Sequence, residues 1–185
     1  MIKQLMRETE DRMKRTMKVL EDDLRTIRTG RASPALVERV KVDYYGTSTP
    51  LNQLAVISAP EPQLLAIRPY DPSSLEAIER AILTSDLGLT PSNDGKIIRL
   101  AIPSLSEERR SELARLVNQR VEEAKIALRN IRREGLNDLR EFEKEKMISE
   151  DAFFRGRDEL QDLIDEYNES AEEIGERKAR EVMET

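Results

Sequence analysis

The chain has 185 residues, a formal net charge of −6 and no histidine, cysteine or tryptophan. Without histidine and cysteine it cannot form a Ser-His or Cys-His nucleophile, a thiolate metal site or a disulfide framework. The N-terminus lacks an apolar run of signal-peptide length, and no segment is apolar enough to span a bilayer. We therefore expect a soluble, cytoplasmic protein with no metal, no cofactor and no membrane partner.

All eight prolines lie in one stretch in the middle of the sequence, and the segments on either side contain none. Proline breaks helix interiors, so the flanking segments are free to form long helices. The sequence predicts a helical domain made of residues 1–30 and 105–185, with a second domain inserted at 31–104. Two connections, near 30–34 and 103–106, join the domains and are expected to act as a double hinge. The expected hinge residues are Gly30, Ser33, Pro34, Pro103 and Ser104.

Apolar residues at heptad spacing predict the first helix, from about Ile2 to Arg28, with Gly30 ending it. The residues that recur along this stripe are Ile2, Met6, Met13, Met17, Leu20, Leu24 and Ile27. Apolar positions at this period are typical of a buried helix face, so we interpret them as core.

The inserted block has the pattern of a small β/α/β domain. Apolar and polar residues alternate from Val40 to Tyr44, which indicates a half-buried strand. Further strands are predicted at Ala55–Ser58, Leu64–Tyr70 and Lys96–Ile102. A short helix is predicted to open at Asp71–Glu76, with Ser73 and Glu76 as a capping box and Leu75, Ile78 and Ile82 facing the sheet.

Two more helices follow the inserted block. The second is predicted to start after Ser106 and to continue to about Lys146, with a core stripe of Leu113, Val117, Val121, Ala124, Leu128 and Ile131. The third is predicted to start after Ser149, with a stripe of Leu160, Ile164, Tyr167, Ala171 and Ile174. The link between them, Met147–Ser149, is so short that they must be antiparallel neighbours. Three such helices close a three-helix bundle, and the fold class is α+β.

Charge is unevenly distributed along the chain. Residues 148–185 carry 13 acidic and 5 basic side chains, whereas residues 106–147 carry 10 and 11. On a helical wheel, an arc beside the core stripe of the second helix holds six of the seven basic residues between 111 and 140. Its basic members are Arg115, Lys125, Arg129, Arg132, Arg133 and Arg140.

This basic arc allows two interpretations. Arginine forks suit bidentate phosphate contact, and the absence of interleaved aromatics favours a duplex backbone over stacked single strands. Alternatively, the arc is a solvated surface whose arginines pair with the acidic third helix. A second basic cluster, Arg25, Arg28 and Arg31 around Gly30, allows the same functional interpretation or simple capping of a helix C-terminus.

Carboxylate pairs give no support to catalysis. Glu107 and Glu108, like Glu150 and Asp151, are explained as acids in the first turn of a helix, where they favour the dipole. The sequence therefore predicts a protein that is not an enzyme and has no catalytic residues.

Five short stretches occur together in one order and at characteristic spacings: Ile27–Pro34, Asp43–Gly46, Ser85–Leu89, Glu107–Arg110 and Arg129–Arg133. On these stretches the chain resembles the ribosome recycling factor family from end to end. The resemblance implies an L-shaped protein with a three-helix bundle and an inserted β/α/β domain. It also implies that, with elongation factor G and GTP hydrolysis by that partner, the protein splits the post-termination ribosome into subunits, releasing mRNA and deacylated tRNA.

The resemblance also implies the binding residues. The family's rRNA-contacting positions match Arg129, Arg132, Arg133, Arg110 and Arg28, and the basic clusters add Lys125 and Arg31. The expected partners are large-subunit rRNA at the intersubunit face and elongation factor G, and the protein is expected to be a monomer.

Three further expectations concern the arginines and the alternative function. Arg132 lies about 26 residues into the second helix, or ~40 Å, which predicts a position beside the N-terminus of the first helix. Gly135 departs from the family pattern and predicts a softer helix there, since glycine costs a helix interior about 0.5–1 kcal/mol. The alternative function is a helical co-chaperone or assembly factor that binds proteins through its bundle, with the arginines paired internally.

Overall fold

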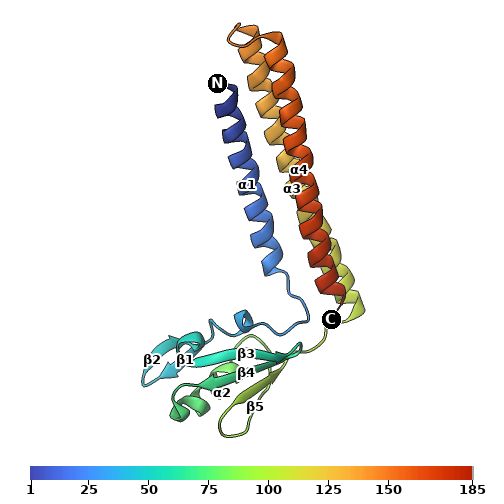
Figure 1. Cartoon of the computed structure of the whole chain (residues 1–185). Helices are drawn as coiled ribbons and strands as arrows, with labels where there is room; N and C mark the ends of the chain where they lie inside the picture. The colour runs from blue at the N-terminus through green and yellow to red at the C-terminus, as the bar shows by residue number, and fades with distance from the viewer. Residues whose placement is uncertain (185) are drawn as a thin grey trace. The chain divides into compact units, whose positions relative to one another are not determined.

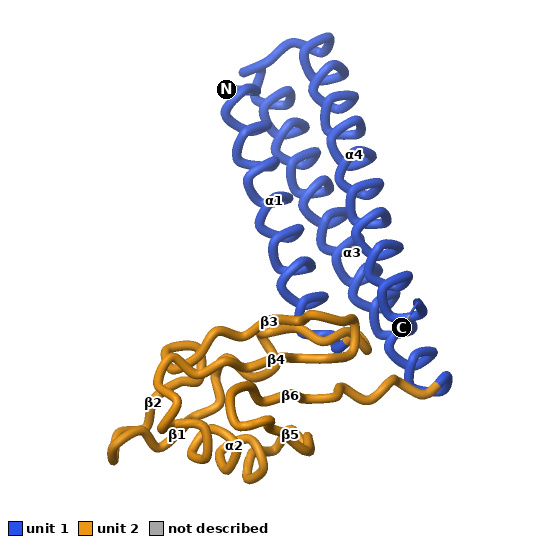
Figure 2. Tube along the Cα trace, turned by 60° about the horizontal axis from the view of Figure 1, so that its bottom comes forward, with its two compact units in different colours: residues 1–28, 107–184 blue, residues 29–106, 185 orange. Residues whose placement is uncertain are grey.

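The computed structural model describes residues 1–184, which form two compact units. The helical unit comprises Met1–Arg28 and Glu107–Glu184, and the inserted unit comprises Thr29–Ser106. Figure 1 labels their helices and strands, and Figure 2 colours the two units separately. Among the described residues, no helix is both long enough and apolar enough to cross a membrane.

The helical unit is a three-helix bundle, as predicted. Its helices are α1 (Ile2–Thr26), α3 (Glu107–Lys144) and α4 (Glu150–Met183), which run alongside one another in both views (Figures 1 and 2). The apolar stripes form its core, including Met13, Leu20, Leu128 and Leu160, each no more than 1% exposed. On α1 the core also takes in Leu5 and Thr9, which the heptad stripe did not include.

The helix ends are set by local hydrogen bonds. Helix α1 ends at Thr26, two residues before the predicted end near Arg28, and Gly30 does not cap it: the Thr26 hydroxyl donates to the Asp23 carbonyl at 2.6 Å, and Ile27 is already extended. At the end of α3, Lys146 takes the left-handed conformation (φ 60°), and the Met147 N–H donates to the Phe142 carbonyl at 2.8 Å. This is a Schellman closure, with lysine where glycine is usual. The Ser149 side chain caps α4 by accepting from the Ala152 N–H, as predicted.

Three buried glycines bring α3 and α4 close together. A Cβ at Gly135 would lie 3.3 Å from Cδ2 of Leu160, and one at Gly156 would lie 3.1 Å from Cδ1 of Leu139. A Cβ at Gly175 would overlap Cγ2 of Val121. Helix propensity alone was considered for Gly135, and the structure adds a packing role: its missing side chain makes room for an aliphatic neighbour on the other helix.

The register of α1 against α3 differs from the sequence estimate. Arg12 pairs with Glu134, and Leu20 lines the same groove as Ala124. Arg132 therefore lies level with the middle of α1, not beside its N-terminus as predicted. The estimate assumed that α1 and α3 end together at the hinge, whereas the first turns of α3 extend past the C-terminal end of α1.

The inserted unit contains two antiparallel sheets. Strands β1 (Lys41–Tyr44) and β2 (Thr47–Pro50) form a hairpin, and the second sheet has the strand order β3-β4-β6-β5. Its strands are β3 (Ala55–Glu61), β4 (Leu64–Pro69), β5 (Pro91–Asn93) and β6 (Ile98–Ala101). Strands β2 and β5 were not predicted, because four and three residues containing a proline leave little alternation to recognise.

Helix α2 (Leu75–Leu83) covers one face of this unit with Ile78 and Ile82, both fully buried, as predicted. The capping prediction is wrong in detail. The cap is Asp71, whose carboxylate accepts the Ser73 N–H at 3.0 Å and the Ser73 hydroxyl at 2.7 Å, and Pro72–Ser74 is a 3₁₀ turn. These hydrogen bonds from Ser73 lower the pKa of Asp71.

Hydrogen bonds within the inserted unit hold the residues next to both connections. The Ala32 N–H donates to the Pro62 carbonyl at 2.6 Å, and Gln63 donates its side-chain amide to the Ser104 hydroxyl at 2.8 Å. The Ile102 N–H donates to the Gln63 carbonyl at 2.9 Å. The segments on which Ser33, Pro34, Pro103 and Ser104 lie are thus attached to the loop between β3 and β4.

Candidate nucleic-acid interface

The outward side of α3 carries arginines that have no hydrogen-bond or ion-pair partner among residues 1–184. Arg129 and Arg133 are exposed, and neither makes a hydrogen bond or an ion pair with any residue from 1 to 184. Arg115 and Arg140 share this exposure and this lack of partners among the described residues. Their guanidinium groups are free to bind an external anion. We call these four residues the outward arginines.

Two other members of the basic arc are engaged with α4. Lys125, whose side chain is 19% exposed, forms a close ion pair with Glu172 and a longer one, 3.8 Å, with Glu122. Arg132 is half-buried and donates from Nη1 to Oε1 of Gln161 at 3.1 Å. Lys125 therefore stabilises the bundle, whereas Arg132 is oriented by an uncharged amide and keeps its charge uncompensated.

This arrangement separates the two interpretations of the basic arc. Helix α4 offers nine carboxylates and no basic residue between 158 and 176. Of the six basic side chains in the arc, Lys125 is the one that forms an ion pair with α4 within residues 1–184. Internal pairing thus explains Lys125 and leaves the arginines available for an external partner.

Two further predicted residues, Arg110 and Arg28, lie away from this cluster within the helical unit. Arg110 is in the first turn of α3, half-buried, and its buried Nε has no acceptor among the described residues. Arg28 and Arg31 are exposed but belong to different units, Arg28 to the helical unit and Arg31 to the inserted unit. Within the helical unit, the structure does not bring Arg110 or Arg28 together with Arg129 and Arg133.

Sequence reasoning missed two arginines on α1. Arg12 and Arg15 line a groove between α1 and α3 with Thr16 and Asn130. Arg12 donates from Nη1 to Oε2 of Glu134 at 2.5 Å, and this hydrogen bond holds the pKa of the Glu134 carboxyl below its usual value. No sequence signal marked them, because both lie outside the apolar stripe by which α1 was recognised.

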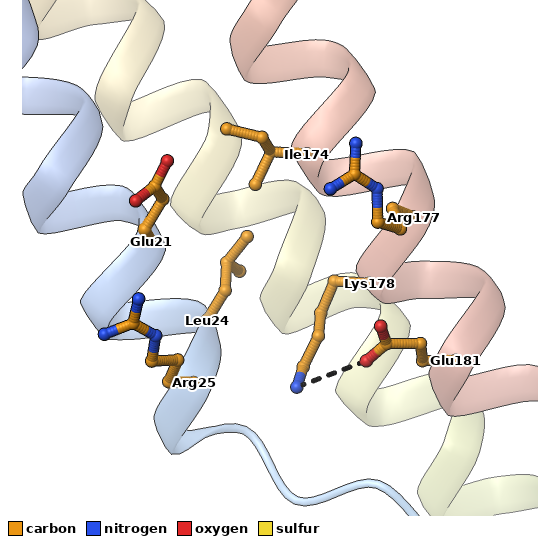
Figure 3. Close-up of a pocket in the computed structure, with 7 residues that line it drawn as sticks. All are labelled: Glu21, Leu24, Arg25, Ile174, Arg177, Lys178 and Glu181. Carbon is orange, nitrogen blue, oxygen red and sulfur yellow. Dashed lines mark ion pairs between the residues drawn. The ribbon is translucent and has the colours of Figure 1, made fainter.

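The groove on the other side of α1, toward α4, is lined by side chains of both charges. Between α1 and α4, basic and acidic side chains alternate around an apolar floor of Leu24 and Ile174 (Figure 3). Lys178 pairs with Glu181, one turn further along α4, at 3.7 Å on one wall of this groove (Figure 3). Its mixed charge makes it a poorer place for a polyanion than the outward side of α3.

Comparison with known families and proteins finds similar sequences over the whole chain. The family model described as ribosome recycling factor matches residues 20–183. A ribosome-recycling factor of Roseiflexus sp. (strain RS-1) is 56% identical over 184 residues, covering all of both chains. One of Heliobacterium modesticaldum (strain ATCC 51547 / Ice1) is 52% identical over the same length, again covering all of both chains.

Two solved structures are also similar. A solution structure of the ribosome recycling factor has a TM-score of 0.72 and 38% identity, covering 100% of this chain and 98% of its own. A second, described as models of the T. thermophilus ribosome recycling factor and the E. coli elongation factor G bound to the E. coli post-termination complex, has a TM-score of 0.62 and 46% identity. That alignment covers 98% of both chains.

Proposed function

The chain belongs to the ribosome recycling factor family, and from this we propose that it binds the post-termination ribosome and splits it into subunits. Elongation factor G and its GTP hydrolysis drive the step, and mRNA and deacylated tRNA are released. The similar structure described on a post-termination complex with elongation factor G supports both partners. The protein acts in the cytoplasm, as a monomer, and as a translation factor rather than an enzyme.

The free arginines of α3 are the observation that carries this proposal. Arg129 and Arg133 extend from a helix held rigidly against α4 and meet no carboxylate within the described chain. Such groups bind phosphate without first breaking an internal pair. We assign them, with Arg132, to the backbone of large-subunit rRNA at the intersubunit face, and we assign Lys125 a structural role.

The two connections provide the second part of the mechanism. Hydrogen bonds fix Ala32 and Ser104 within the inserted unit, so we place the flexible positions at Thr29–Arg31 and Leu105. While the arginines anchor the helical unit on rRNA, elongation factor G displaces the inserted unit about this double hinge. Movement against an anchored body then separates the subunits.

Substitution of Arg132 tests the anchoring role. Arg132→Gly removes a cation and adds a helix-interior cost of about 1 kcal/mol, so ribosome affinity should fall at least about tenfold while the bundle remains folded. Arg132→Ala keeps helix propensity and separates the two effects. Affinity of Arg132→Ala equal to that of the parent, measured by sedimentation with ribosomes, would show that this residue is not an anchor.

A reversible cross-link tests the hinge. The parent has no cysteine, so one engineered cysteine in each unit can form a single defined disulfide. The oxidised protein should bind ribosomes normally but fail to split them with elongation factor G and GTP, followed by light scattering. Reduction should restore splitting. Full activity of the oxidised protein would rule out the hinge mechanism and favour a passive wedge.

A further inference from the structure

We propose that the RNA-binding face continues from α3 across the α1–α3 groove onto α1, where Arg15 contacts a backbone phosphate and Arg12 neutralises Glu134. This inference rests on the proposed function and extends it to residues that the sequence did not indicate. The ligand group is a phosphodiester of the same RNA that the outward arginines hold.

The groove adjoins the outward arginines directly. Asn130 lines it from α3, and Arg12, Arg15 and Thr16 line it from α1, above a floor that includes Ile131. Arg133 lies three residues after Asn130, about one turn along the same helix surface. An RNA backbone bound by Arg133 therefore reaches the Asn130 side chain next, and then the α1 residues on the opposite side of the groove.

Arg15 is the cation on the α1 side of the groove that is available to bind a phosphate. It is exposed and makes no hydrogen bond or ion pair with any other described residue. The neighbouring cations Lys14 and Lys18 line the opposite groove, toward α4, together with Glu21 and Asp22. Within the described part of the chain, Arg15 is thus a free cation of α1 on the side of the RNA-binding face.

Arg12 acts through Glu134 rather than on RNA. Glu134 directly follows Arg133, and its carboxylate stands at the groove, where an uncompensated charge would repel a phosphate. The Arg12 guanidinium bonds this carboxylate at 2.5 Å. A glutamate carboxylate is ionised at neutral pH, so Glu134 would repel a phosphate there unless a cation lies beside it. The Arg12 guanidinium supplies that cation, and the same contact lowers the pKa of Glu134. Arg12 is therefore a positioning residue.

Charge substitutions separate the two roles. Arg15→Ala should weaken ribosome binding about three- to tenfold and reduce the slope of log affinity against log salt by about one. Lys18→Ala, one turn further along α1 but in the opposite groove, is the matched control and should leave affinity and slope unchanged. Thermal unfolding of each variant excludes a loss of the fold.

A double substitution tests the role of Arg12. Arg12→Ala should weaken binding, and Arg12→Ala with Glu134→Gln should restore it, because the exposed carboxylate is then gone. Arg15→Ala with Glu134→Gln should stay weak, since the phosphate contact is still missing. An unchanged salt slope for Arg15→Ala, or no rescue of Arg12→Ala by Glu134→Gln, overturns the inference.

The proposed function has a separate readout in the same assay. If Arg129→Ala with Arg133→Ala loses affinity while Arg15→Ala does not, the interface ends on α3 and only the inference fails. If neither variant loses affinity, the anchoring part of the proposed function fails as well.

Discussion

Helix α3 has two charged sides that differ in the contacts that their side chains make with the rest of the protein. Toward α4, Lys125 pairs with Glu172, and aliphatic side chains lie directly over the backbone at glycines. At the border of the two sides, Arg132 donates to the uncharged Gln161 and keeps its charge available for binding. Away from α4, Arg129 and Arg133 make no hydrogen bond or ion pair with any other described residue. One basic arc on a helical wheel is thus two surfaces, a packed side that fixes the helix and an outward side that is available to bind.

The packed side should respond most strongly to added volume. Gly175→Ala places a methyl group against Val121, and we expect a loss of about 2 kcal/mol in the free energy of unfolding, within the range for overpacked cores. Urea denaturation measures this loss. The folded fraction should keep its ribosome affinity, because the outward arginines are untouched. Unchanged stability would mean that the α3–α4 seam is looser than described.

A hydrogen bond between α4 and α1 tests whether specific contacts also hold α1 in the bundle. The Tyr167 hydroxyl donates to Oε1 of Glu10 at 3.2 Å. Tyr167→Phe should cost about 1 kcal/mol of unfolding free energy, as for a typical hydrogen bond. An unaltered unfolding midpoint would show that the Tyr167–Glu10 hydrogen bond does not stabilise the bundle.

The same tyrosine gives a pH signature. Burial, followed by the nearby Glu10 carboxylate, raises the pKa of Tyr167 to about 12 from its ordinary value of 10.0. The folded state therefore resists ionisation. The resulting stabilisation is fully present below pH 10.0 and is lost as pH rises toward about 12. The stability difference between the parent and Tyr167→Phe should shrink over this interval, and a constant difference would contradict the assignment.

Gly135→Ala should have the smallest effect and sharpens the contrast with Gly175. Its Cβ would lie 3.3 Å from the end of a flexible Leu160 side chain, which can yield. The gain in helix propensity, about 1 kcal/mol, roughly offsets this contact, so stability should change by no more than about 0.5 kcal/mol. A loss as large as that of Gly175→Ala would show that both glycines are equally constrained.

Much of the fold could be predicted because its signals are local. Heptad stripes gave the three long helices, and Ser149 with its following acids marked the start of α4. The packing role of Gly135 could not be predicted, because helix propensity describes one helix, whereas the contact with Leu160 comes from another. Strands as short as β5 carry too few alternating positions to be recognised.

The candidate site was only partly predictable, for a related reason. A wheel gives the direction of a side chain on its own helix but not the neighbour it meets, so Lys125 and Arg129 could not be told apart. Arg12 and Arg15 were missed because their relation to α3 depends on the register of two helices that are distant in sequence. That register is set by packing, for which the sequence holds no local signal.

The salt dependence of ribosome binding tests the division of α3 most directly. Each phosphate contact that is lost should lower the slope of log affinity against log salt by about one. Arg129→Ala with Arg133→Ala should therefore lower the slope by about two, whereas Lys125→Ala should leave it unchanged. Equal slopes for all three proteins, or a fall for Lys125→Ala matching that of the double variant, would contradict the assignment of binding to the outward arginines.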